Sequence, residues 1–83
     1  MSFYMYILYS ERKDRYYVGS CEDFNVRLEQ HNSGRNKSTS YGVPWTMKKV
    51  EEFSTRAEAT ARELHIKKMK SRRFIEQVIT GER

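Results

Sequence analysis

The sequence predicts an α+β domain with the element order β-β-α-β-α-α, in which helices flank a three-stranded antiparallel sheet. Two observations lead to this class. Aromatic and apolar runs at residues 3–9 and 16–20 have the composition of strands and are separated by a short polar stretch. Three later segments each follow a helix-capping residue and carry apolar side chains at helical spacing. With 83 residues, the chain is expected to form one small domain over residues 1–83.

The first two strands, at residues 3–9 and 16–20, are expected to form a hairpin, because the polar loop between them has the usual length. Gly19 lies inside the second strand, where glycine is unfavourable unless another group must approach the backbone closely. In an antiparallel pair, the residue numbers of two directly facing residues always add up to the same total, the index sum. Tyr6 and Tyr17 therefore point to the same face of the sheet if that total is odd. The alternative is that both tyrosines are ordinary strand aromatics.

Residues 23–53 are expected to form a helix, a loop and a third strand. Asp23 can cap a helix that ends near Gly34, a residue suited to the C-terminal cap. Four side chains recur at helical spacing along it: Phe24, Arg27, Leu28 and His31. Residues 35–44 are polar and contain glycine and proline, which favours a loop, and residues 45–53 are expected to form the third strand.

Two further helices are predicted in the last third of the chain. Thr55 and Glu58 form a capping box for the first of them. This helix carries the apolar residues Ala57, Ala61, Leu64 and Met69. Ser71 can cap the second helix. The apolar side of that helix consists of Phe74, Ile75, Val78 and Ile79.

Positive charge is concentrated towards the C-terminus. The net charge of +5 arises from 16 basic and 11 acidic residues, and residues 55–83 hold eight of the basic but only four of the acidic ones. The densest part of this region contains Lys67, Lys68, Lys70, Arg72 and Arg73. Such a patch on a small domain indicates nucleic acid as a partner. The alternative is a solvated helix face.

The composition excludes several classes of protein. The mean hydropathy of −0.90 is too polar for a membrane protein, and no apolar run approaches the roughly 20 residues that span a bilayer. A single cysteine, Cys21, excludes an internal disulfide framework and a zinc site built on several cysteines. The chain also lacks the pattern of an export signal. We therefore expect a reduced, cytoplasmic protein without membrane association.

Two residue pairs at helical spacing could carry chemistry. Arg27 and His31 share a helix face, where arginine can bind a phosphate and histidine can transfer a proton. Glu63 and Lys67 are also four residues apart, and a lone carboxylate can hold Mg²⁺, which keeps several of its waters. The alternatives are a solvated arginine beside a surface histidine, and an ordinary helix ion pair. The spacing alone does not decide between them.

Taken in order, these residues resemble the GIY-YIG endonuclease superfamily. The two half-motifs are Tyr-Met-Tyr at 4–6, with tyrosine where the family has glycine, and Tyr-Val-Gly at 17–19. Arg27 and His31 follow within the segment Arg-Leu-Glu-Gln-His-Asn-Ser-Gly, and Glu63 lies within Arg-Glu-Leu-His-Ile-Lys-Lys. The resemblance covers nearly the whole chain. It is greatest to the small single-domain group related to the N-terminal nuclease domain of the UvrC excision-repair subunit.

The resemblance implies a divalent-metal-dependent endonuclease that cuts nucleic acid, DNA in particular, in DNA repair or processing. It implies that Glu63 holds one Mg²⁺ or Mn²⁺ ion, and that Tyr6 or Tyr17 activates or orients the attacking water. Arg27 would stabilise charge on the phosphate, and His31 would orient a tyrosine or relay its proton. The nucleic-acid backbone would be held by Lys67, Lys68, Lys70, Arg72 and Arg73.

Two other functions stay open at this point. The first is a catalytically weak or inactive nucleic-acid-binding module of the same fold. The second is a protein-interaction domain whose basic patch is incidental. A domain of this size has no room for a separate sequence-reading element, so we expect low sequence specificity, or a protein partner that supplies specificity.

Overall fold

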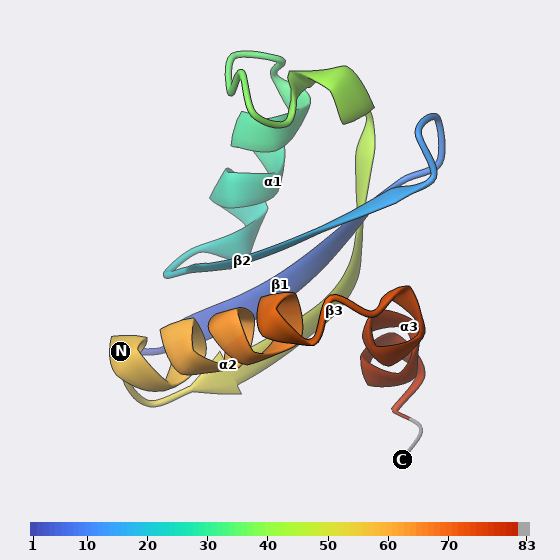
Figure 1. The fold of residues 1–83 in the computed structure, drawn as a ribbon. Coiled ribbons are helices and arrows are strands. Elements are labelled where there is room, and N and C mark those ends of the chain that lie inside the picture. The colour runs from blue at the N-terminus through green and yellow to red at the C-terminus, as the bar shows by residue number, and fades with distance from the viewer. Residues whose placement is uncertain (82–83) are drawn as a thin grey trace.

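Three antiparallel strands form the sheet at the centre of the computed structural model, which describes residues 1–81 (Figure 1). The strands are β1 (Phe3–Ser10), β2 (Arg15–Cys21) and β3 (Trp45–Phe53). β1 lies in the middle and pairs with both of the others, so the order across the sheet is β2-β1-β3. β2 and β3 are therefore the edge strands.

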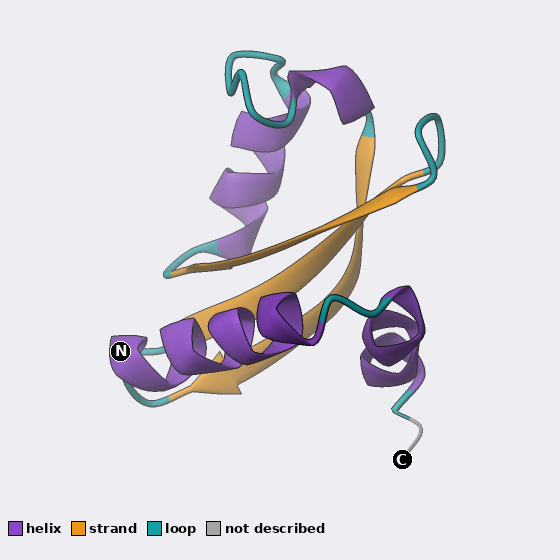
Figure 2. Ribbon diagram, viewed as in Figure 1, coloured by secondary structure: helices purple, strands orange, loops and turns teal. Residues whose placement is uncertain are grey.

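The described helices are α1 (Phe24–Asn32), α2 (Arg56–Met69) and α3 (Arg72–Thr80). Figure 2 shows helices on both sides of the sheet. The side chains of Asp23, Thr55 and Ser71 accept hydrogen bonds from backbone N–H groups of the first turns, which confirms the three predicted caps. The segment predicted as a loop contains a short 3₁₀ helix at Ser40–Gly42. The observed order of elements and the antiparallel sheet confirm the predicted fold class.

None of the helices within residues 1–81 is long and apolar enough to cross a membrane.

The sheet separates two apolar clusters. Alternate residues of a strand point to opposite faces, so β1 contributes side chains to both clusters. The cluster that packs against α2 and α3 contains the buried residues Met5, Ile7, Val18, Ile66 and Val78. The cluster on the α1 side contains the buried residues Tyr6, Leu8, Cys21 and Trp45, with Phe24 and Leu28 packed against them. Because α1 and α2 cover opposite faces, side chains from the two helices can meet only around an edge of the sheet.

Helix α2 packs against the sheet with a different face from the one that carries most of its apolar residues. The apolar positions identified from the sequence, including Leu64 and Met69, are exposed to solvent. The buried residues of the helix are instead Ala59 and Ile66, seven positions apart and so on one face. Glu63 lies between these two residues on the same stripe, four positions after Ala59 and three before Ile66. The packing of α2 therefore turns Glu63 towards the sheet.

The register of the hairpin places the two motif tyrosines on the same face. Tyr6 pairs with Gly19, and Leu8 pairs with Tyr17, so the index sum is 25, which is odd. A Cβ atom at Gly19 would overlap the ring of Tyr6, with Cζ only 2.6 Å away. The group that approaches the backbone of Gly19 closely, as a glycine within a strand indicates, is therefore the ring of Tyr6.

Candidate functional site

The five side chains predicted to form the site come together around β2, an edge strand of the sheet. They are Tyr6 of β1, Tyr17 of β2, Arg27 and His31 of α1, and Glu63 of α2. The tyrosines and His31 approach from the face that α1 covers, and Glu63 approaches from the face that α2 covers (Figure 1). Because β2 has no neighbour on its outer side, groups from both faces can reach the same strip of surface.

A hydrogen-bonded chain leads from Tyr6 into the protein. The Tyr6 hydroxyl lies 3.0 Å from Nε2 of His31, and Nδ1 of His31 lies 2.8 Å from Oγ1 of Thr39. All three residues are almost completely buried, with Tyr6 exposed by 2% and His31 by 1%. The sequence left open a surface histidine beside a solvated arginine; the burial of His31 excludes it. His31 instead connects the first motif tyrosine to the segment between α1 and β3.

Burial keeps Tyr6 and His31 in their neutral forms. Burial raises the pKa of Tyr6 above its ordinary value, and the neighbouring Tyr17 raises it further, whereas Arg27 acts in the opposite direction. For His31, burial lowers the pKa and the charge of Arg27 lowers it again. The charge of Arg27 favours the ionised form of Tyr6, but burial outweighs that effect. Tyr6 is therefore a poor source of phenolate.

The buried His31 predicts a loss of stability in mild acid. The folded state holds the pKa of His31 below its ordinary value of about 6.5, so below that pH the unfolded chain binds more protons than the folded one. The free energy of unfolding should therefore fall as the pH decreases from 7.5 to 5.5. Urea unfolding curves at several pH values measure this change. His31→Gln should flatten the pH dependence, and the control His65→Gln, at an exposed position on α2, should retain it.

Tyr17 differs from Tyr6 in exposure and in its contacts. Its side chain is only partly buried, and among residues 1–81 its hydroxyl has no hydrogen-bond partner. The centroid of its ring lies 4.8 Å from that of His31 and 6.3 Å from that of Tyr6. Nζ of Lys67 lies 5.9 Å from the ring centroid. Tyr17 thus presents a hydroxyl that is available to a water or a phosphate.

Glu63 is held from two sides. The hydroxyl of Ser20 on β2 donates a hydrogen bond to Oε1 at 2.6 Å, and Nζ of Lys67 donates to Oε2 at 2.5 Å. The Glu63 side chain is 16% exposed, whereas that of Lys67 is 46% exposed. The ion pair that the sequence allowed is therefore present, but Glu63 is also fixed to the edge strand. Since Lys67 also contacts the ring of Tyr17, it links Glu63 to the tyrosines.

The groups around Glu63 fit a single divalent cation that keeps most of its waters. Within residues 1–81 no three His, Cys, Asp or Glu side chains gather as a metal cluster, and Glu63 is the one carboxylate among the five site residues. The carboxylate of Glu63 and the hydroxyl of Ser20 are oxygen donors, the kind that Mg²⁺ and Mn²⁺ prefer. Lys67 holds one of these oxygens, and its half-exposed side chain can move away at little cost.

Arg27 supplies a positive charge near Tyr6 and His31. Its guanidinium forms no salt bridge with any residue in the range 1–81. Together with Ser20 and Gln30, it lines a cleft of about 310 Å³. Ser20, whose hydroxyl binds Glu63, is one lining residue, and the acidic residues Glu22 and Asp23 also line this cleft. Arg27 can therefore bind an anion that enters this cleft.

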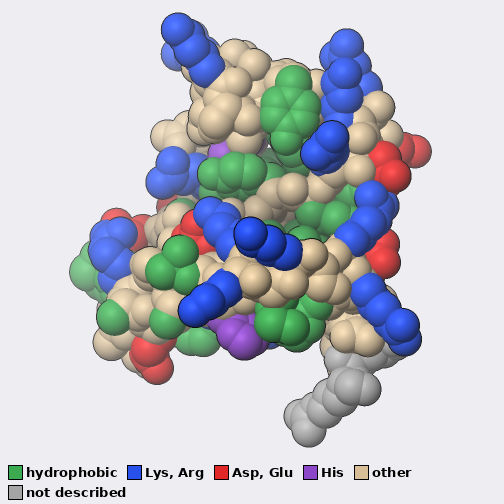
Figure 3. Space-filling view, in the orientation of Figure 1, with side chains coloured by type: hydrophobic (Ala, Val, Ile, Leu, Met, Phe, Trp, Pro, Cys, Tyr) green, Lys and Arg blue, Asp and Glu red, His purple; other side chains and the backbone are tan. Residues whose placement is uncertain are grey.

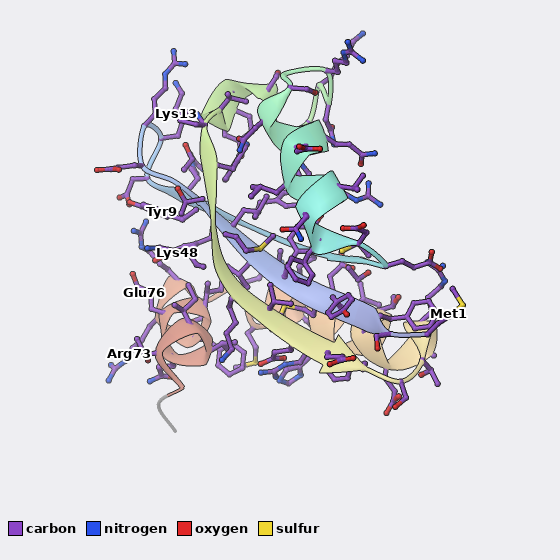
Figure 4. All side chains as sticks on the ribbon, turned by 180° about the vertical axis from the view of Figure 1, so that it is seen from behind. Met1, Tyr9, Lys13, Lys48, Arg73 and Glu76 are labelled. Carbon is purple, nitrogen blue, oxygen red and sulfur yellow. The ribbon has the colours of Figure 1, made fainter. Side chains whose placement is uncertain are left out.

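The predicted basic patch divides into two parts. Lys67, Lys70 and Arg72 line a cleft of about 390 Å³ between β2 and the junction of α2 and α3, and Tyr17 lines the same cleft. Lys68 and Arg73 are exposed outside it. Figure 3 shows lysine and arginine side chains gathered on the face that carries α2, and in Figure 4 Arg73 extends outward from α3.

Arg72 has partners of its own. It donates hydrogen bonds to the carboxylate of Asp14 at 2.5 Å and to that of Glu76 at 3.4 Å, and it lies over the ring of Tyr16. These contacts tie α3 to the loop of the β1–β2 hairpin. The first contact holds the pKa of Asp14 below its ordinary value. Among the three residues of the predicted patch that line the cleft, Arg72 is thus the only one bound to two described carboxylates.

Two residues of the site were not identified from the sequence. Ser20 follows directly after the second half-motif, and strand alternation from Gly19 places it on the opposite face, where Glu63 lies. That signal was present in the sequence. Thr39 lies in a polar segment without periodicity, so nothing in the local pattern connects it to His31.

The unusual tyrosine of the first half-motif does not enter the site. Tyr4 packs edge-on against Phe24 of α1, with ring centroids 5.0 Å apart. Cys21, two residues beyond Gly19, is buried at the end of β2, and burial raises the pKa of its thiol. It therefore has the surroundings of a core residue and not those of a nucleophile.

Comparisons with known proteins identify the family and the fold. Residues 2–76 match the GIY-YIG catalytic domain. Among solved structures, the chain is similar to the UPF0213 protein BH0048 from Bacillus halodurans, determined by solution NMR. The identity is 31%, the TM-score is 0.60, and the similarity covers 96% of this chain and 84% of the other. A comparison with curated proteins returned no significant match. Because the domain match covers nearly the whole chain, from the first half-motif past Glu63, this protein belongs to the GIY-YIG family and has its nuclease-type fold.

Proposed function

We propose that this protein is a metal-dependent endonuclease that hydrolyses phosphodiester bonds in DNA with low sequence specificity, in DNA repair or processing. The observation that carries the proposal is the meeting of Tyr17, Glu63 and Lys67 around one open sheet edge. A phenol that can handle a proton, a carboxylate that can bind a metal ion and a cation that can stabilise charge together suit phosphodiester hydrolysis. Membership of the GIY-YIG family supports the same reaction class.

Tyr17 is the tyrosine that acts on the attacking water. Its hydroxyl is partly exposed and has no partner within residues 1–81, so a water can bind to it. Tyr6 is buried and engaged with His31, which suits a supporting role. The ring of Tyr6 packs against that of Tyr17 and thereby limits the directions in which the Tyr17 hydroxyl can point.

Charge on the phosphate is balanced by Arg27 and Lys67. Arg27 can donate two parallel hydrogen bonds to phosphate oxygens from the cleft that it lines with Ser20. Lys67 can turn from Glu63 to the phosphate, because its side chain is half-exposed. Glu63 and Ser20 would hold the Mg²⁺ or Mn²⁺ ion, which would supply stabilisation of negative charge on the phosphate and on the leaving oxygen.

The cleft beside Tyr17 gives the nucleic-acid backbone a path away from the cut phosphate. Lys70 and Lys67 line this cleft, and Lys68 and Arg73 add positive charge around it. Contacts of this kind hold phosphates and carry no information about the base sequence. Low sequence specificity follows, and a protein partner would supply any preference for particular sites or structures.

A binding module of the same fold is the second candidate. The observation that favours it is the ion pair between Lys67 and Glu63, since a lysine bound to the carboxylate competes with a metal ion for the same oxygen. Such a module would bind nucleic acid but leave it intact in the presence of Mg²⁺ or Mn²⁺. Cleavage assays on labelled single-stranded, duplex and branched DNA, with RNA alongside, separate the two functions.

Substitution of Lys70 tests the proposed grip on the backbone. Lys70→Gln should weaken DNA binding equally for unrelated sequences and reduce the slope of log K against log salt by about one. Fluorescence anisotropy at several salt concentrations measures both effects. The matched control is Lys48→Gln on β3, the edge strand opposite β2. This substitution should leave the slope unchanged. Binding that is independent of salt would rule out the nucleic-acid function altogether.

A further inference from the structure

Thr39 lies between α1 and β3, and its side chain is fully buried against the site. Oγ1 of Thr39 is 2.8 Å from Nδ1 of His31. The backbone of the same residue is anchored on both sides: its carbonyl accepts a hydrogen bond from Nε1 of Trp45 at 2.8 Å, and its N–H donates to the carbonyl of Asn36 at 3.1 Å. Thr39 is therefore a fixed end point for the chain of hydrogen bonds that leads through His31 to Tyr6.

The protons of this chain can be arranged in two directions, because a neutral histidine carries only one ring proton. If Thr39 donates to His31 and His31 donates to Tyr6, the buried phenol proton of Tyr6 has no acceptor within residues 1–81. A buried polar group without a partner is costly. The opposite direction leaves no proton unpaired. Tyr6 donates to Nε2 of His31, Nδ1–H of His31 donates to Thr39, and the Thr39 hydroxyl can donate to the carbonyl of Asn36 at 3.5 Å.

We propose that Thr39 is a positioning residue that holds His31 in the form with the proton on Nδ1, and thereby holds the Tyr6 phenol as a donor to Nε2. The neutral states that burial imposes on Tyr6 and His31 are consistent with this arrangement. The consequence for catalysis rests on the proposed nuclease function: a fixed Tyr6 ring keeps its neighbour Tyr17 in a productive orientation. The tautomer itself does not depend on that function.

Nitrogen NMR of the wild-type protein tests the tautomer directly. Ring nitrogens with and without a proton differ widely in ¹⁵N chemical shift, so a histidine-labelled sample shows which nitrogen of His31 is protonated. His65, the other histidine, is exposed on α2 and provides an internal reference. We expect the proton on Nδ1 of His31 at pH 7.5. A proton on Nε2, or on both nitrogens, would overturn the proposal whether or not the protein cleaves DNA.

The pair Thr39→Val and Thr39→Ser tests the role of the hydroxyl. Valine has nearly the shape of threonine without the hydroxyl, whereas serine keeps it. Thr39→Val should shift part of the His31 population to the Nε2–H form and lower kcat by about tenfold, the effect of one buried hydrogen bond, with KM nearly unchanged. Thr39→Ser should retain the wild-type spectrum and most of kcat.

Wild-type spectrum and kcat in folded Thr39→Val would contradict the proposal. If Thr39→Val does not fold, the spectra of the wild type and of Thr39→Ser decide: an Nε2–H tautomer in Thr39→Ser contradicts it. A wild type that shows the Nδ1–H tautomer but no cleavage would defeat the proposed nuclease function and leave the structural role of Thr39 standing.

Discussion

Glu63→Gln is expected to lower metal-dependent cleavage of DNA by about a thousandfold or more, because the only carboxylate in the site loses its charge. Glutamine has the same shape as glutamate and can still accept the hydrogen bond from Ser20, so the fold should be retained. The variant should also lose its affinity for Mn²⁺. Single-turnover cleavage with Mg²⁺ or Mn²⁺ measures the first effect, and isothermal titration calorimetry with Mn²⁺ measures the second.

Glu29→Gln is the matched control for this substitution. Glu29 is exposed on α1, and within residues 1–81 its carboxylate forms no salt bridge. Removal of the same charge at this position should leave the cleavage rate within about twofold of that of the wild type, since exposed single charges contribute little. Cleavage that survives Glu63→Gln at the wild-type rate would exclude Glu63 as the metal ligand. Mn²⁺ affinity equal to that of the wild type would exclude it independently of any activity.

Tyr17→Phe is expected to reduce the cleavage rate by about 100- to 10,000-fold, the usual contribution of a group that handles a proton in the reaction. The same substitution should change the free energy of unfolding little, because among residues 1–81 the Tyr17 hydroxyl forms no hydrogen bond. Cleavage rates and urea unfolding curves on the same preparation measure the two effects.

Tyr6→Phe should lower the stability of the protein more, and its cleavage rate less, than Tyr17→Phe. It removes the hydrogen bond to His31 and leaves Nε2 of a buried ring without a partner, which costs about 1–3 kcal/mol of stability. Its cleavage rate should fall less than that of Tyr17→Phe. If Tyr6→Phe loses more activity than Tyr17→Phe while it remains folded, the assignment of the water to Tyr17 is wrong. Tyr41→Phe, an exposed tyrosine outside the site, is the control for handling and concentration.

Local sequence signals were sufficient for most of the elements. The three helix caps could be predicted because a capping side chain acts on backbone groups only two or three residues away. The third strand was predicted at Trp45–Phe53 with the bounds that the structure shows. The predicted hairpin strands were shorter than the observed ones by one residue, at one end of β1 and at both ends of β2, where the sequence carries little signal.

The orientation of α2 was not predictable in the same way. Its sequence contains one apolar stripe with Ala57, Ala61 and Leu64 and another with Ala59 and Ile66. Either stripe could have faced the sheet, and local propensity does not distinguish them. In the structure the stripe with Ile66 faces the sheet, and Ile66 packs in one apolar cluster with Ile7 and Val18. This choice also decided where Glu63 points.

Sequence patterns were enough to name the candidate residues and the elements on which they lie: helical spacing puts Arg27 with His31, and an odd index sum in the hairpin puts Tyr6 and Tyr17 on one face. The surroundings of each of these residues came from tertiary contacts alone. The tertiary structure buried His31 and Tyr6, left the hydroxyl of Tyr17 available, and brought Glu63 to the same edge from the opposite face. The reason is physical: a residue's exposure and its partners depend on contacts between segments far apart in the chain. The bond between Ser20 and Glu63 spans 43 positions, beyond any local pattern.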